Sequence, residues 1–226
     1  EALIATYAEQ SRECEAEKIL PTNTWQMVSV PQAIPFAATS VENVFGPSID
    51  GEYDVDWVVY DYERMGNSYE KLEADSLLSR GTGYWIIQTT GADAVLRMPE
   101  NGLAAFGDTL PACASENGCI NWRLNASDDV AWNLVGNPMC RAVAVEELRV
   151  IASDGLCAAA DGCTLEEASD TTGADLVHDR LWIYDGEAYR SFGSGETLGI
   201  WDGFWIPALD GALDLQPQVL LPVASR

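Results

Sequence analysis

The chain carries the same series of three short sequence blocks twice, in the same order. The matching blocks are Trp-Gln-Met-Val-Ser-Val-Pro at 25–31 and Trp-Asn-Leu-Val-Gly-Asn-Pro at 132–138, Val-Val-Tyr-Asp at 58–61 and Trp-Ile-Tyr-Asp at 182–185, and Gly-Tyr-Trp-Ile at 83–86 and Gly-Phe-Trp-Ile at 203–206. Three blocks in one order indicate a tandem duplication, which constrains the architecture before any single residue is interpreted. The 226 residues are therefore predicted to fold as two related modules.

Each copy has the pattern of a β protein. In the first copy, short apolar segments at 57–62, 68–72, 83–89 and 94–98 are separated by turn residues such as Gly91. We therefore expect an all-β fold of two duplicated antiparallel modules, each like a sandwich or a barrel. The first module is assigned to residues 21–100, the second to 131–226, and a connecting segment to 101–130.

Residues 1–20 lie outside both copies and are predicted to form an N-terminal α-helix. Leu3, Ile4 and Tyr7 fall near one face, acidic residues occupy much of the rest, and Pro21 ends the helix. A different possibility is that this segment is the stub of a longer helix, as in a truncated pilin-like filament subunit.

The six cysteines predict a disulfide-stapled protein. Four of them form two pairs of identical spacing, and each pair encloses an Asn-Gly or Asp-Gly turn. These pairs are Cys113 with Cys119 and Cys157 with Cys163, which leaves Cys14 and Cys140 to pair with each other. Redox motifs use Cys-x-x-Cys and zinc sites combine shorter spacings with His, so both are disfavoured. Three disulfides indicate an oxidising compartment, extracellular or at the cell surface.

The charge of the chain argues against two classes of partner. Its 36 acidic and 12 basic residues give a formal net charge of -24. Nucleic acid and anionic membrane surfaces are bound by clustered Lys and Arg, so neither is expected as a partner. No apolar run reaches the ~20 residues that cross a bilayer, so this segment is not expected to insert into a membrane.

Acidic residues alternate with other residues near the start of the first copy. In an extended strand, Asp50, Glu52, Asp54 and Asp56 would share one face. Calcium takes about 6–8 oxygen ligands, so this face is a candidate calcium site, and no other cofactor is expected. The alternative is a charged edge strand that discourages aggregation between sheets.

Eight tryptophans are available for a core or for a binding face. Trp25, Trp85, Trp132 and Trp205 recur between the copies in apolar strands, which favours core packing. The remaining aromatic residues include candidates for an exposed face that stacks on sugar rings. They are Trp57, Trp122, Trp182 and Trp201, together with Tyr53, Tyr62, Tyr69 and Tyr189.

The sequence gives little indication of catalysis. His178 is the single histidine, lies beside Asp179, and is accompanied by no Gly-x-Ser-x-Gly nucleophile motif. A polysaccharide hydrolase with two catalytic carboxylates stays formally open, although Asp and Glu are too abundant for their presence to favour it. We predict that the chain is not an enzyme.

The repeated blocks Trp-Asn-Leu-Val-Gly-Asn-Pro, Trp-Ile-Tyr-Asp and Gly-x-Gly-Tyr-Trp-Ile resemble modules that recur in large secreted and cell-surface bacterial proteins, often beside adhesion domains. The resemblance covers most of residues 24–99 and 131–217, with one departure. The first copy reads Gly81-Thr-Gly83, whereas the second reads Trp201-Asp-Gly203. The resemblance implies an extracellular, adhesin-like interaction module with surface proteins or glycans as partners. A carbohydrate-binding module, a filament subunit and a hydrolase are the alternatives.

Overall fold

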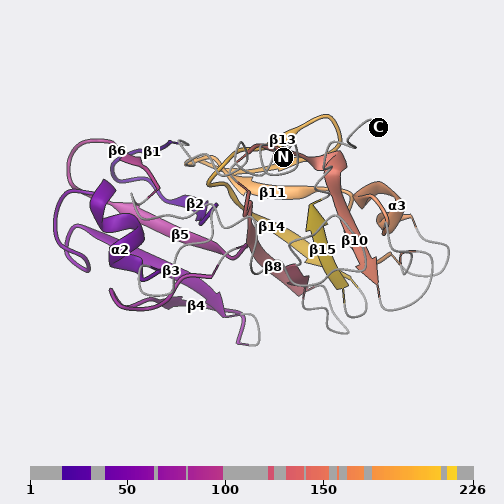
Figure 1. Cartoon of the computed structure of the whole chain (residues 1–226), viewed down its shortest axis with the longest axis horizontal. Helices are drawn as coiled ribbons and strands as arrows, with labels where there is room; N and C mark the ends of the chain where they lie inside the picture. Colours follow the sequence, from indigo (N-terminus) through magenta and orange to yellow (C-terminus); the bar gives the residue numbers. More distant parts are fainter. Residues whose placement is uncertain are drawn as a thin grey trace, which may run out of the picture.

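The chain folds as antiparallel β-sheets with a few short helices (Figure 1). The computed structural model describes residues 17–31, 39–63, 66–79, 81–98, 122–124, 131–139, 141–152, 157, 162–170, 175–209 and 213–217. The all-β prediction is therefore confirmed. Among the described residues, no helix is long and apolar enough to cross a bilayer.

The first repeat is built on a four-stranded sheet. Its strands, in spatial order, are β2 (Gln26–Ser29), β5 (Gly83–Gln88), β3 (Trp57–Glu63) and β4 (Ser68–Lys71). A second pair, β1 (Lys18–Leu20) with β6 (Ala94–Leu96), lies beside it. Helix α2 (Val41–Phe45) begins at Ser40, whose side chain accepts a hydrogen bond from the Asn43 backbone N–H. This helix packs Val41, Val44 and Phe45 into the core of the first repeat, and η2 (Gly46–Ser48) follows it directly.

The second repeat has the same sheet in the same strand order. Its strands are β8 (Ala131–Gly136), β14 (Gly203–Ala208), β11 (Leu181–Tyr184) and β12 (Tyr189–Phe192). Beside it lie β10 (Leu148–Ala152), β15 (Leu213–Pro217) and β7 (Trp122–Leu124), together with the pair β9 (Val143–Ala144) and β13 (Thr197–Leu198). The short helices are η3 (Val145–Glu147) and α3 (Leu165–Ser169).

Strand register confirms that the two sheets are equivalent. Met27 of β2 pairs with Trp85 of β5, and Leu134 of β8 pairs with Trp205 of β14, as the first and third sequence blocks require. The second block is displaced, because Tyr60 pairs with Trp85 whereas Trp182 pairs with Trp205. The structural match is therefore Tyr60 with Trp182, two residues away from the match in sequence. A shift of two leaves each side chain on its original face.

Several backbone contacts between the repeats occur twice, once in each direction. The Ser29 N–H donates to the Trp201 carbonyl at 2.8 Å, and the Gly136 N–H donates to the Gly81 carbonyl at 3.0 Å. Ser29 and Gly136 occupy equivalent positions, as do Gly81 and Trp201. A second equivalent pair of contacts consists of the bridges Val28 with Asp202 and Thr82 with Val135. Reciprocal contacts of this kind define a twofold, isologous interface, here within one chain.

Trp201 replaces the glycine found at the equivalent position 81 of the first repeat, and its side chain joins the two repeats. Gly81 has a φ of 79°, and Trp201 keeps this left-handed conformation with a φ of 71°. The Trp201 side chain is fully buried in the hydrophobic core of the first repeat, with its ring 6.4 Å from that of Phe45. Asp202 adds an ion pair with Lys18 at 2.7 Å. The second repeat thus fills part of the core of the first.

Two predictions on the N-terminal helix and the disulfides have different outcomes. Lys18–Leu20 forms a strand rather than the end of a helix, because pairing with β6 satisfies its backbone and buries Leu20. Residues 1–16 lie outside the described part of the chain. The Cys157–Cys163 disulfide is confirmed, with both residues buried. Cys14, Cys113, Cys119 and Cys140 also lie outside the described residues.

We expect the stability of the protein to fall at alkaline pH through Tyr84. Burial raises the pKa of Tyr84 to about 12, above its ordinary value of 10.0. Since the folded protein holds this proton more tightly than the unfolded chain, the stabilisation is complete below pH 10 and is lost as the pH rises towards 12. Two pH units correspond to about 2–3 kcal/mol of unfolding free energy. Urea titrations at several pH values measure this loss.

The control variant for this prediction is Tyr84→Phe. The equivalent residue of the second repeat is Phe204, also fully buried, so this sheet position accepts phenylalanine. The Ser79 N–H donates to the Tyr84 hydroxyl at 2.6 Å. Its loss should lower stability near pH 8 by about 1 kcal/mol. The further loss between pH 10 and 12 should shrink in the variant, and an unchanged loss would show that Tyr84 is not its source.

Candidate functional site

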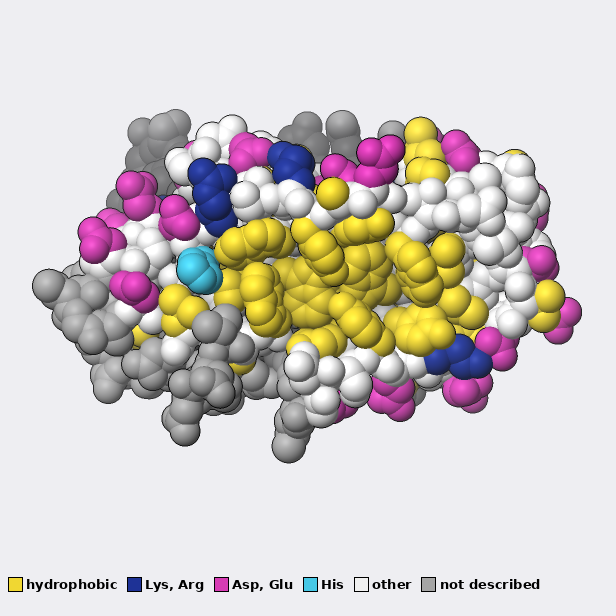
Figure 2. Space-filling view, turned by 180° about the vertical axis from the view of Figure 1, so that it is seen from behind, with side chains coloured by type: hydrophobic (Ala, Val, Ile, Leu, Met, Phe, Trp, Pro, Cys, Tyr) yellow, Lys and Arg dark blue, Asp and Glu magenta, His cyan; other side chains and the backbone are white. Residues whose placement is uncertain are grey.

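One surface of the molecule gathers most of the described Trp and Tyr side chains. Strand residues alternate between two faces, so each sheet turns one set of side chains to its own core and the other set outwards. The outward sets of the two sheets meet in one continuous apolar area across the middle of the molecule (Figure 2). We call it the aromatic face. It comprises Trp25, Tyr60, Tyr62, Tyr69 and Trp85 of the first repeat and Trp132, Trp182, Tyr184, Tyr189 and Trp205 of the second.

The ring contacts within each repeat are nearly identical. The Trp25 and Trp85 rings are 6.3 Å apart at an interplanar angle of 82°, and the equivalent Trp132 and Trp205 rings are 6.3 Å apart at 89°. Trp132 also meets Trp182 at 5.2 Å. Edge-to-face contacts between aromatic rings are favourable, so these rings hold one another in place.

The rings also cross between the repeats in a reciprocal way. Tyr62 of the first repeat packs against Trp205 of the second at 4.7 Å, and Tyr184 of the second packs against Trp85 of the first at 5.4 Å. Beneath them, the Met27 sulfur accepts a hydrogen bond from the Tyr184 N–H at 3.3 Å. Each half of the aromatic face therefore packs against a ring of the other repeat.

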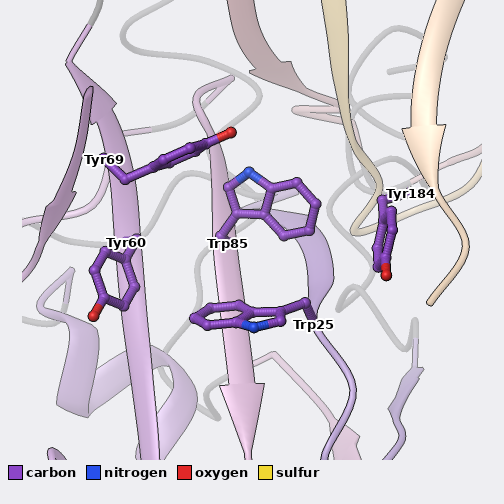
Figure 3. Close-up of a pocket in the computed structure, with 5 residues that line it drawn as sticks. All are labelled: Trp25, Tyr60, Tyr69, Trp85 and Tyr184. Atoms are coloured by element: carbon purple, nitrogen blue, oxygen red, sulfur yellow. The ribbon is translucent and has the colours of Figure 1, made fainter. Parts of the chain in front are cut away.

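Two pockets open on the aromatic face, and they are related by the same twofold arrangement. The first has a volume of 310 Å³ and is lined by Trp25, Tyr60, Tyr69, Trp85 and Tyr184 (Figure 3). The second has a volume of 420 Å³ and is lined by the five equivalent residues together with Tyr69 and Asn67. Its lining residues are Tyr62, Asn67, Tyr69, Trp132, Trp182, Tyr189 and Trp205. The described linings therefore contain no charged side chain.

Tyr69 and Tyr189 lie between the two pockets and are the most exposed phenols of the aromatic face. They are equivalent residues, 52% and 53% exposed. Partial burial of the Tyr69 side chain, together with the nearby Tyr189 phenol, raises the pKa of Tyr69 to about 12. The Tyr69 hydroxyl is therefore neutral and able to donate a hydrogen bond at physiological pH.

The structure corrects the sequence-based division of the tryptophans. Trp25 and Trp132 were expected in the core but are 37% and 41% exposed. Trp57 and Trp201 were candidates for the exposed face but are buried in the first core, because their strand or turn position points them inward. Trp182 does lie on the aromatic face, and the backbone of Trp122 lies in β7.

The other aromatic candidates separate in the same way. Tyr62, Tyr69 and Tyr189 lie on the aromatic face. Tyr53 instead packs against Trp57 at 4.7 Å, and its hydroxyl donates a hydrogen bond to the Leu72 carbonyl. Trp85 and Trp205 are 8% and 6% exposed, so they form the floors of the pockets while packing as core residues.

The four carboxylates predicted to share one strand face do not do so. Residues 54–56 form a turn, with Asp54 at a φ of 67°, so the extended conformation behind the prediction is absent. The Asp56 carboxylate accepts a hydrogen bond from the Glu52 N–H at 2.8 Å, Asp54 pairs with Lys71 at 2.7 Å, and Asp50 is exposed. Among the described residues, no three His, Cys, Asp or Glu side chains are grouped to hold a metal ion.

Two remaining polar sites give little support for catalysis. His178 is exposed beside the aromatic face, with its ring 5.7 Å from Trp182. A separate pocket of 240 Å³ in the second repeat contains Glu146 and Arg180. The pKa of Glu146 is lowered by a hydrogen bond from its own backbone, and further by hydrogen bonds that its carboxylate accepts from the Gly195 N–H and, at 2.9 Å, from the Ser194 hydroxyl. A carboxylate held ionised in this way is a poor general acid.

Comparisons of the chain with protein-family models, curated proteins and solved structures give no match.

Proposed function

We propose that this protein is a non-catalytic interaction module of an exported bacterial surface protein, and that its ligand docks on the aromatic face. The observation that carries the proposal is the pair of equivalent pockets, each built from both repeats. Contiguous exposed apolar surface is uncommon on soluble domains and is typical of interaction sites. Tyr and Trp are also the side chains that most often dominate binding energy.

Rigidity of the aromatic face adds to the argument. Each indole is held by edge-to-face contacts, and Trp85 and Trp205 are anchored in paired strands. A preorganised surface loses little conformational entropy when a ligand binds. The aromatic face is therefore suited to recognition, and the carboxylates needed for hydrolysis are missing from the described linings of both pockets.

Carbohydrate is a second candidate ligand, favoured by the second pocket. Asn67 lines this pocket and accepts a hydrogen bond from the Tyr62 hydroxyl. Together with the hydroxyls of Tyr69 and Tyr189, its amide could satisfy sugar hydroxyls while the indoles stack on the sugar ring. The filament alternative depends on residues 1–16, outside the described part of the chain.

The indole N–H signals of the eight tryptophans test the proposal by nuclear magnetic resonance. The protein is titrated in turn with soluble oligosaccharides, proline-rich peptides and quaternary ammonium compounds. We expect at least one class to shift signals of Trp25, Trp85, Trp132, Trp182 or Trp205. Trp57 and Trp201, buried in the first core, should stay unchanged as internal controls. If every class leaves the signals of the aromatic face unmoved, the proposal is wrong.

A further inference from the structure

The first pocket has the shape of a box with aromatic walls. Tyr60 and Tyr184 stand on either side of Trp85, with Trp25 and Tyr69 on the other two sides (Figure 3). The walls are steeply inclined to one another, since the Trp25 plane makes angles of 70° with Tyr60 and 82° with Trp85. Because the rings are steeply inclined, a group seated in the pocket would meet ring faces and ring edges from several directions. A flat stacking platform would instead have its rings in one plane.

The chemistry of these walls selects among possible ligands. All five lining residues are aromatic, whereas the second pocket also has the Asn67 amide. A sugar seated in the first pocket would bury hydroxyl groups with few partners, which costs free energy for each unpaired group. A group with an apolar surface and a positive charge meets no such cost. The negative faces of Trp and Tyr rings attract a cation within about 6 Å of the ring centre.

The charge around the box is compatible with a cation. The protein carries a formal net charge of -24, which raises the local concentration of cationic ligands. Lys71 pairs with Tyr60 across the sheet and is therefore a cationic residue next to one wall of the pocket. Its ammonium group is held by the Asp54 carboxylate at 2.7 Å. The competing positive charge is thus neutralised outside the box.

We propose that the first pocket is an aromatic cage that binds a trimethylammonium group, such as the head group of choline. A volume of 310 Å³ accommodates this head group and part of the chain attached to it. A trimethylammonium ion has no N–H to donate, so the scarcity of acceptors in the box costs it nothing. This inference rests on the proposed function, because it identifies the ligand class of one part of the aromatic face.

Choline and its uncharged isostere 3,3-dimethylbutan-1-ol separate the cation effect from simple hydrophobic contact. Both are titrated into the whole protein while the indole N–H signals of Trp25 and Trp85 are followed. We expect choline to bind at least about tenfold more tightly than the isostere, which corresponds to about 1.4 kcal/mol of cation–π attraction. Equal affinity for the two compounds would overturn the aromatic cage.

Equivalent residues of the two repeats supply matched variants. Trp25→Ala removes one wall of the first pocket and should weaken choline binding about tenfold. Trp132→Ala removes the equivalent indole of the second pocket and should change the affinity for choline less than twofold. Tyr60→Ala, at the first pocket alone, gives an independent check if Trp25→Ala disturbs the fold. An equal loss in Trp25→Ala and Trp132→Ala would contradict a site in the first pocket.

The outcomes also separate this inference from the proposed function. If choline fails but an oligosaccharide or a proline-rich peptide shifts the indoles of the aromatic face, the inference is wrong and the proposed function stands. If no ligand class shifts them, both are wrong.

Discussion

Replacing Trp201 by alanine is expected to lower the unfolding free energy by about 3–5 kcal/mol, the usual cost of truncating a fully buried tryptophan. The side chain belongs to the second repeat but fills the core of the first beside Phe45. Its loss would therefore leave a cavity where the repeats are joined. Urea denaturation measures the effect. A change below about 1 kcal/mol would mean that this indole does not hold the repeats together.

Trp201→Gly separates packing from backbone strain at the same position. Trp201 has a φ of 71°, which costs an L-residue roughly 1–2 kcal/mol relative to glycine. The glycine variant restores the residue found at Gly81 and should be about 1 kcal/mol more stable than Trp201→Ala, while still less stable than the wild type. If the glycine variant is less stable than the alanine variant, the left-handed backbone is not a source of strain.

The second large effect is expected at Gly136, where the two repeats are in tight contact. A Cβ atom added there would lie 2.1 Å from the Ser29 Cβ and 3.1 Å from the Thr82 carbonyl oxygen. Overpacking usually lowers the unfolding free energy by about 1–3 kcal/mol. Because the Thr82 backbone leaves little room to adjust, we expect Gly136→Ala to cost at least about 3 kcal/mol. Gly193→Ala is the control, since its Cβ would be 3.4 Å from its nearest neighbour.

A compensating substitution makes this prediction specific. Ser29 and Gly136 are equivalent residues that meet at the twofold axis, so one Cβ fits between them and two do not. Ser29→Gly removes the obstructing Cβ. It also removes the 3.0 Å hydrogen bond from the Ser29 hydroxyl to the Asn137 carbonyl, which costs about 1 kcal/mol of stability. Ser29→Gly combined with Gly136→Ala should recover most of the stability lost in Gly136→Ala alone. Purely additive losses would show that the two residues do not compete for the same space.

The duplication and the fold class could be predicted because they depend on local patterns. The recurring blocks of Trp25 and Trp132 lie in equivalent strands, and the glycine-bounded segments at 83–86 and 203–206 pair with them in the same register. Alternation of apolar residues sets the strands. The second block was aligned two residues away from its structural match, since Tyr60 and Tyr184 have similar neighbours in sequence. Pairing with β5 and β14 decides the register, and sequence similarity does not report it.

The aromatic face could not be predicted in the same way, because it depends on how the two repeats pack together. A strand with aromatic residues on one side and apolar residues on the other has two buryable faces, and the sequence does not say which one stays open. Trp25 was therefore assigned to the core, and Trp57 was a candidate for the exposed face. The alternation of Tyr60 with Tyr62, and of Trp182 with Tyr184, was a usable signal. It places each pair on one face.

Differential scanning calorimetry of the whole chain tests most directly whether the two repeats form one body with a shared aromatic face. Since Trp201 lies in the core of the first repeat and Tyr62 and Tyr184 cross between repeats, both repeats should unfold in a single transition. The calorimetric and van't Hoff enthalpies should then agree, and Trp201→Ala should shift the whole transition downwards. Two separate transitions, or a shift of one alone, would contradict the account.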